Sequence, residues 1–247
     1  MNLIKAEKKY KDTHVKILTD KEKYVDFALD EIINQRKSLE NYIKNNPKFL
    51  SSLKPIKAER NSPKIVKMMA EGAEIAGVGP MAAVAGTISE FAVRKMVKQG
   101  AKVALVENGG DIFVVTDRKL SIGLFAGQSA IKDKLAFQLE PNDTPIAICS
   151  SSSKLGHSLS YGDCDLVTVF SKKSSIADAV ATASCNKVKK ESDIEKVLEW
   201  AASLEGVKGI IIVKNKKVGI NGDVPKLVPA RDLLLKDKIT KEEFYQV

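Results

Sequence analysis

The chain has 247 residues, of which 44% are hydrophobic and 29% are charged. This composition excludes a disordered, collagen-like or mainly membrane-embedded chain, and the length allows one large domain or two small ones. The formal net charge is +9, but the basic excess lies in residues 1–70 and 187–247, whereas residues 71–186 are nearly neutral. Only five of the 40 basic residues are arginines, so the charge indicates a solvated surface rather than a nucleic-acid-binding face.

The N-terminal segment, the apolar runs and the cysteines together predict a cytoplasmic protein that does not interact with a membrane. No apolar stretch near Met1 is long enough for a signal peptide. The longest uncharged run, from Ile75 to Ser89, is shorter than a membrane span and contains a proline and three glycines. An odd number of widely spaced cysteines predicts buried thiols rather than a disulfide framework or a zinc site, and these are Cys149, Cys164 and Cys185.

The N-terminal part of the chain is predicted to form strands and then helices. Residues 3–18 alternate loosely between apolar and polar types, which indicates one or two strands. Asp20 is a candidate cap for a helix that begins at Lys21. Helices are predicted, in chain order, at 21–45, 62–76 and 80–99.

The rest of the chain is predicted to be mainly strands. Apolar runs bounded by turn signals predict strands at 103–106, 112–115, 120–125, 135–139, 145–150, 166–170, 207–213, 218–220 and 227–228. Helices are predicted at 175–186 and 192–204, the second with Ser192 and Glu195 in a capping-box pattern, and Asn221-Gly222 suggests a tight turn between the last two strands. Helices, then adjacent strands, then helices favour an α+β fold with a mostly antiparallel sheet over a doubly wound α/β sheet.

The first candidate site is the segment Asn108-Gly109-Gly110-Asp111 between two predicted strands. Adjacent glycines allow positive φ and a close approach of the backbone to a ligand, while Asn108 and Asp111 could orient a polar group. The alternative is a hairpin turn without a ligand, because Asn-Gly and Gly-Gly are favoured turn dipeptides.

The second candidate site is the pair Asp178 and Thr182, which stand four residues apart and therefore emerge from one face of a helix. A carboxylate and a hydroxyl among small residues are suited to a hard cation such as Mg²⁺. The alternative is that Asp178 only stabilises the start of its helix through the macrodipole.

Two further segments are candidates. Ser150 and Ser151 begin a serine-rich loop that offers hydroxyl and N–H groups to an anion, and His157 in this loop could carry a proton near neutral pH. An ordinary polar loop is the alternative, and a serine hydrolase is not supported because no GxSxG motif occurs. The small-residue run from Gly77 to Thr87 enters a helix and either approaches a phosphate or packs closely on the sheet.

These segments, taken in order, resemble the ApbE-like superfamily of FMN transferases over roughly residues 75–190. Gly86–Ile112 is similar to the helix that leads into that family's Asn-Leu-Gly-Gly-Asp segment, and Ile148–His157 is similar to its Thr-Ser-Gly…His loop. The most specific match is Ala177–Thr182, which resembles the family's Ala-Asp-Ala-x-Ala-Thr. The chain looks closest to a small prokaryotic branch, common in archaea, rather than to the transferases themselves.

The resemblance implies a single T-fold-related ApbE-like domain over residues 1–247, divided into 1–70, a motif-bearing core at 71–190, and 191–247. It implies Mg²⁺ and FAD as cofactors, an acceptor protein, and release of AMP. Asp178 and Thr182 carry over as metal ligands and His157 as the catalytic residue. The nucleotide-binding residues would be Asn108, Gly109, Gly110, Asp111, Ser150 and Ser151.

The chain also departs from the family pattern. The transferases' Lys-Gly pair reads Gly86-Thr87 here, their His-x-x-Asp-Pro stretch reads His157–Tyr161, and their upstream Ser-Gly-x-Phe-Asp-Pro-Thr motif has no counterpart. The interpretations are therefore an enzyme acting on a flavin nucleotide with Mg²⁺, a ligand-binding protein without turnover, or an enzyme for a non-flavin substrate that uses the Ser150–His157 loop. The sequence also allows a homodimer.

Overall fold

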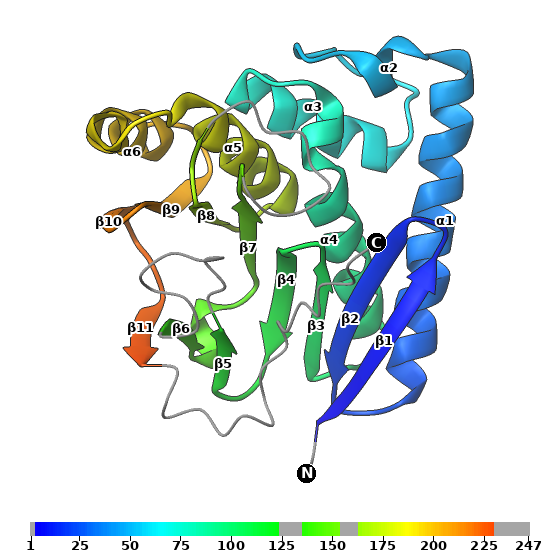
Figure 1. The fold of residues 1–247 in the computed structure, drawn as a ribbon. Coiled ribbons are helices and arrows are strands. Elements are labelled where there is room, and N and C mark those ends of the chain that lie inside the picture. The colour runs from blue at the N-terminus through cyan, green and yellow to red at the C-terminus, as the bar shows by residue number, and fades with distance from the viewer. Residues whose placement is uncertain (1–2, 124–134, 154–162, 230–247) are drawn as a thin grey trace, which may run out of the picture.

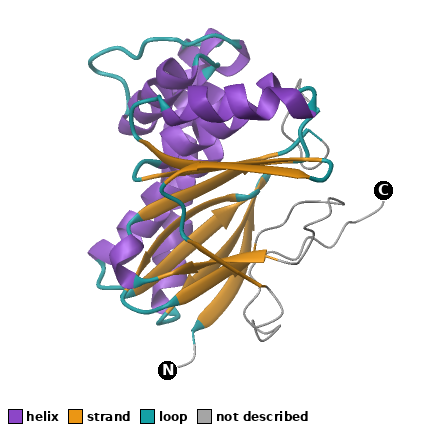
Figure 2. Cartoon of the chain, turned by 90° about the vertical axis from the view of Figure 1, so that its left-hand side faces the viewer, coloured by secondary structure: helices purple, strands orange, loops and turns teal. Residues whose placement is uncertain are grey.

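The computed structural model describes residues 3–123, 135–153 and 163–229. A large antiparallel sheet carries its helices on one face (Figure 1), and a view turned by 90° shows the helices and the strands as separate layers (Figure 2). A second, smaller sheet packs against the other face of the large sheet through a shared apolar cluster. The prediction of an α+β fold with a mostly antiparallel sheet is confirmed.

The large sheet has eight strands in the order β1-β2-β3-β4-β7-β8-β9-β10, and each neighbouring pair is antiparallel. The small antiparallel sheet has the order β11-β6-β5. The strands are β1 (Ile4–Tyr10), β2 (Thr13–Thr19), β3 (Val103–Asn108), β4 (Asp111–Thr116), β5 (Leu120–Gly123), β6 (Leu135–Leu139), β7 (Ile146–Ser151), β8 (Leu166–Ser171), β9 (Val207–Lys214), β10 (Lys217–Gly222) and β11 (Lys226–Pro229).

Six α-helices and three short 3₁₀ helices complete the described part of the chain. The α-helices are α1 (Lys23–Asn45), α2 (Lys48–Ser51), α3 (Lys64–Ala76), α4 (Val84–Lys98), α5 (Ser174–Lys187) and α6 (Ile194–Ala202). The 3₁₀ helices are η1 (Pro80–Ala83), η2 (Pro141–Asp143) and η3 (Glu191–Asp193). None of the described helices is by itself long and apolar enough to cross a bilayer. Helix α3 and the η1–α4 segment, bent by 106° relative to each other, together have the length and apolar composition of a broken membrane span.

Both faces of the central strands are covered, which explains their nearly continuous apolar sequence. In β3, Ala104 and Val106 belong to the cluster between the large sheet and the helices. Val103 and Leu105, which alternate with them, belong to the cluster between the two sheets. Because successive side chains point to opposite faces of a strand, every second residue of β3, β4 and β7 faces the helices.

The prediction that Asp20 caps a helix at Lys21 is wrong. Helix α1 begins at Lys23. The residue at its N-cap position is Glu22, whose side chain makes no capping hydrogen bond. The Asp20 carboxylate instead accepts hydrogen bonds from the backbone N–H groups of Lys102 and Val103, at 3.1 and 3.2 Å. The Asp20 side chain therefore connects the end of β2 to the start of β3. Such a bond needs the folded sheet, because Asp20 and these N–H groups are far apart in the sequence.

Two predicted local signals near the C-terminal end are also wrong. Ser192 does not cap α6; the nearby Asp193 carboxylate accepts the N–H groups of Lys189 and Lys190, at 3.0 and 2.9 Å. Asn221-Gly222 lies within β10 rather than in a turn. β10 and β11 belong to different sheets, so no tight turn joins them, and the hairpin turn at Asn215, with φ 56°, joins β9 to β10 instead.

Helix α3 packs against α5 through the backbone at Gly72. A Cβ atom added to Gly72 would lie 2.1 Å from the carbonyl oxygen of Ser175, which is too close for any real contact. The only side chain that fits is hydrogen, and the interface between these helices therefore depends on this glycine.

We expect Gly72→Ala to lower the free energy of unfolding by about 1–3 kcal/mol, because overpacking a buried contact forces the backbone to move. Denaturant-induced unfolding followed by circular dichroism measures this loss. Glu74→Ala, at an exposed position of the same helix, is the control and should change the stability by less than about 0.5 kcal/mol. Equal unfolding midpoints for Gly72→Ala and the parent chain would contradict the packing argument.

Candidate functional site

The Asn108–Asp111 segment is the turn of the β3–β4 hairpin, with Asn108 paired opposite Asp111. Gly109 and Gly110 have φ values of 61° and 96°, which glycine adopts without strain. Asn108 and Asp111 are both buried, and the side-chain amide of Asn108 donates a 3.3 Å hydrogen bond to the carbonyl oxygen of Ala85 in α4. The turn is thus attached to the first turn of a helix.

Gly86, in that same first turn, brings α4 against α5. Its backbone N–H donates a 2.9 Å hydrogen bond to Oδ2 of Asp178. A Cβ atom at this position would lie 3.0 Å from Cβ of Asp178 and 3.1 Å from Sγ of Cys149. The absence of a side chain at Gly86 therefore lets the backbone of α4 approach Asp178 closely.

Asp178 lies close enough to Asp111 to influence the ionisation of Asp111. Burial raises the pKa of Asp178 to about 7, although hydrogen bonds from the backbone of Gly86 and Ala85 oppose this rise. Burial and then the negative charge of Asp178 raise the pKa of Asp111 well above its ordinary value. Burial raises the pKa of the Cys149 thiol in the same way, with Asp111 and Asp178 as the next causes. The structure thus joins the first two candidate sites, which are separated in the sequence.

The donor set around these carboxylates fits a hard cation. Within the described residues neither Asp111 nor Asp178 has an ion-pair partner, so two buried carboxylates lack a compensating positive charge. The half-buried Thr182 adds a hydroxyl one helical turn after Asp178. Among residues 3–123, 135–153 and 163–229, no group of three His, Cys, Asp or Glu side chains that could hold a metal occurs. Mg²⁺ usually needs only one or two carboxylates, because it keeps several of its waters.

The two serines of the loop face opposite sides of β7. The backbone N–H of Ser150 donates a 3.3 Å hydrogen bond to Oδ1 of Asp111, but its hydroxyl is 2.9 Å from Oγ1 of Thr168 on the face toward the small sheet. Ser151, two residues after Cys149, is buried on the helix-facing side. Ser150 therefore reaches the Asp111 carboxylate through its backbone and not through its hydroxyl. His157 lies outside the described residues.

Glu90 is a buried residue of this region that the sequence did not single out. Its side chain is 2% exposed, and its Oε2 accepts a 2.7 Å hydrogen bond from the backbone N–H of Ser174, the first residue of α5. Glu90 stands four residues after Gly86, and the other buried residues of α4 have small or apolar side chains. A lone acidic residue on this helix face was the sequence signal that could have identified it. Glu90 and Asp178 each bond the first turn of the other's helix, and we call this pair of bonds the reciprocal caps.

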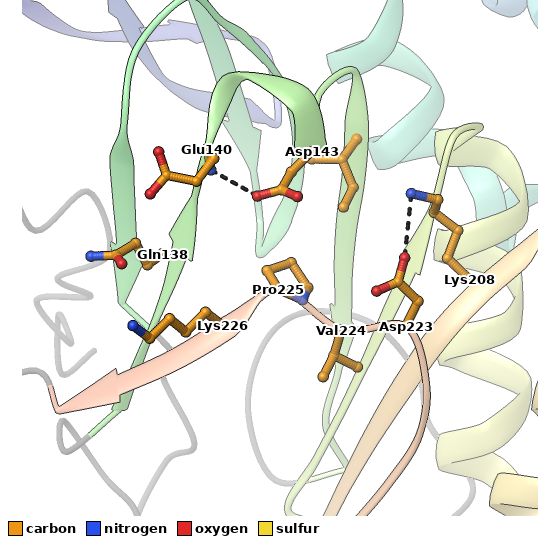
Figure 3. A pocket seen from close by; sticks show the side chains of 9 residues that line it. Gln138, Glu140, Asp143, Lys208, Asp223, Val224, Pro225 and Lys226 are labelled. Atoms are coloured by element: carbon orange, nitrogen blue, oxygen red, sulfur yellow. Dashed lines mark hydrogen bonds and ion pairs between the residues drawn. The ribbon is translucent and has the colours of Figure 1, made fainter.

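A recess of about 260 Å³ lies on the other face of the large sheet. Figure 3 shows Pro225 between Lys226 and Val224, with the side chains of β6, η2 and β9 around it. Nζ of Lys208 is 3.8 Å from Oδ2 of Asp223, and Asp143 accepts the backbone N–H of Glu140. None of the candidate residues lines this recess, so it is separate from the site at Asp178.

The raised pKa values predict a pH-dependent stability. Between the ordinary value of 3.8 and about 7, the folded protein keeps a proton at Asp178 that the unfolded chain releases. In metal-free buffer we therefore expect Asp178→Asn to become more stable relative to the parent as the pH rises from 4 to 8, because the amide carries no charge. Urea unfolding across this range measures the difference, and a difference that does not change with pH would contradict the burial argument.

Comparison with known proteins identifies relatives along nearly the whole chain. The family model described as AbpE bacteria matches residues 4–214. The UPF0280 protein of Methanococcus aeolicus is 40% identical over 229 residues, covering 91% of this chain and 92% of its own. That of Archaeoglobus fulgidus is 43% identical over 238 residues, covering 94% and 97%.

Two solved structures share the fold. The flavinyl transferase ApbE of Pseudomonas stutzeri has a TM-score of 0.55 at 11% identity, covering 89% of this chain and 94% of its own. The ApbE protein of Thermotoga maritima has a TM-score of 0.55 at 13% identity, covering 90% and 97%. The chain therefore belongs to the ApbE-like superfamily, in the branch that the archaeal UPF0280 proteins form.

Proposed function

We propose that this protein binds FAD together with Mg²⁺ at the Asn108–Asp111 turn, and that its chemistry is cleavage of the FAD pyrophosphate with transfer of FMN to an acceptor protein. The observation that carries the proposal is the pair of buried carboxylates, Asp111 and Asp178, without a positive partner in the described residues. The structural neighbours named flavinyl transferase and ApbE protein supply the substrate class.

The turn and the helices provide complementary parts of such a site. A Cβ atom at Gly109 would meet nothing within 4 Å, and one at Gly110 would come no closer than 3.8 Å to Ser150, so the turn is bare enough for a ligand to approach its backbone. Asp178 and Thr182 would hold Mg²⁺ through oxygen atoms. When bound, Mg²⁺ would neutralise the charge of a pyrophosphate. Asn108 keeps the turn attached to α4.

Calorimetric titration with FAD, with and without Mg²⁺, followed by chromatography for AMP and FMN, tests the proposal. We expect Mg²⁺-dependent binding and release of AMP. Binding that needs Mg²⁺ but yields no AMP would limit the function to that of a flavin-nucleotide carrier. FAD binding that is absent, or equal with and without Mg²⁺, would contradict the proposal.

The proposed metal ligand gives a sharper test. Asp178→Asn keeps an oxygen that can accept the Gly86 N–H but removes the charge, so we expect Mg²⁺-dependent FAD affinity to fall at least about tenfold, which equals about 1.4 kcal/mol. Asp30→Asn, at an exposed position in α1, is the matched control and should bind like the parent. Unchanged binding by a folded Asp178→Asn variant would exclude Asp178 as a ligand.

The proposed catalytic role of His157 predicts a different effect. We expect His157→Asn to lower the rate of AMP release by about 10²-fold or more while changing FAD affinity little, because a residue that transfers a proton acts on the reaction step. Single-turnover kinetics beside calorimetry separates the two quantities. An equal loss of rate and affinity would instead indicate that His157 positions the ligand.

A further inference from the structure

We propose that Glu90 is a positioning residue for Asp178: by bonding the start of α5 it sets where Asp178 stands relative to the Asn108–Asp111 turn. This inference rests on the proposed function, because the site that Asp178 serves is the proposed Mg²⁺ site. Glu90 itself lies in α4 and holds the backbone N–H of Ser174, not the proposed ligand.

The geometry of the reciprocal caps carries the inference. Gly86 and Glu90 are one turn apart on α4, and Ser174 and Asp178 are one turn apart on α5. Glu90 bonds the N–H of Ser174 at 2.7 Å, and Asp178 bonds the N–H of Gly86 at 2.9 Å. The two bonds close a ring across the helices, so a shift of α5 along α4 that breaks one bond also strains the other.

Helix α4 is in turn fixed to the turn that would receive the ligand. The hydroxyl of Ser89 donates a 3.1 Å hydrogen bond to the carbonyl oxygen of Asp111, and Asn108 holds the carbonyl oxygen of Ala85 at 3.3 Å. A continuous set of hydrogen bonds therefore runs from the turn to α4, from α4 through Glu90 to α5, and so to Asp178. Without Glu90, the bonds of this set that reach α5 would be those that Asp178 itself accepts.

The two capping carboxylates differ in their charge balance. Oε1 of Glu90 is 2.7 Å from Nε of Arg94, whose guanidinium also lies 5.3 Å from the ring centre of Phe113. The N-terminus of α5 adds a favourable dipole. Glu90 thus has a partner on each of its oxygens, whereas Asp178 has no ion pair in the described residues. This difference assigns Glu90 to positioning and leaves Asp178 for a cation.

The test compares the Mg²⁺ concentration that half-saturates FAD binding in the parent, Glu90→Ala, Glu90→Gln and Arg94→Ala, under conditions where circular dichroism shows each to be folded. We expect Glu90→Ala to raise it about tenfold while FAD affinity without Mg²⁺ is unchanged. Glu90→Gln keeps an oxygen for the Ser174 N–H and should stay within about threefold of the parent. Arg94→Ala, which leaves that bond intact, should stay within about twofold.

An unchanged half-saturating Mg²⁺ concentration in folded Glu90→Ala would overturn the inference. So would an equal loss of FAD affinity with and without Mg²⁺, because that pattern indicates general damage to the fold. If Glu90→Ala does not fold, Glu90→Asp replaces it: it keeps the charge but is one methylene too short, and the same rise is expected.

A second measurement separates this inference from the proposed function. If the parent shows no Mg²⁺-dependent FAD binding, the proposed function fails, and the reciprocal caps are tested by the unfolding equilibrium of Glu90→Ala, Asp178→Ala and the double variant, each of which removes an acceptor oxygen. Coupling should move the double variant's equilibrium constant at least about threefold from the product of the single effects. Additive effects would overturn the positioning role.

Discussion

Gly86 in the first turn of α4 and Ser174 at the start of α5 are buried, so their backbone N–H groups are shielded from water. A buried N–H group without a partner is costly, so each helix start requires an acceptor from elsewhere in the fold. Each helix receives it from the other: Glu90 bonds Ser174 and Asp178 bonds Gly86. The position of Asp178 relative to the Asn108–Asp111 turn follows from this exchange, because the turn is itself bonded to α4.

Such close packing is possible because the contact is made by backbone and small side chains. A Cβ atom at Gly86 would be crowded by Asp178, Cys149 and the carbonyl oxygen of Ser174, all at 3.0–3.1 Å. The same exclusion of water that makes the contact tight raises the pKa of Asp178 and Asp111, so the dense packing also disfavours ionisation of these two carboxyl groups. A cation at this point would stabilise their ionised form, which connects the packing of the helices to the proposed flavin-nucleotide chemistry.

Local patterns predicted most of the elements and part of the site. Alternation and turn residues indicated the strands of the sheet, since side-chain direction along a strand depends only on sequence parity. The glycine pair predicted the hairpin turn, and the four-residue spacing put Asp178 and Thr182 on one helix face. Local patterns gave wrong predictions where a side chain bonds a residue that is distant in the sequence. Asp20 bonds the start of β3, and Ser150 turns its hydroxyl toward Thr168.

The sequence by itself determined the α+β order of elements, the glycine turn and the family resemblance, because these depend on residues close together in the chain. Only the tertiary structure decided that Asp111 lies beside Asp178, 67 residues away in the sequence, and that Glu90 bonds Ser174. Those contacts arise when the sheet and the helices bury their apolar faces together. No local pattern encodes them, since burial selects partners by position in space.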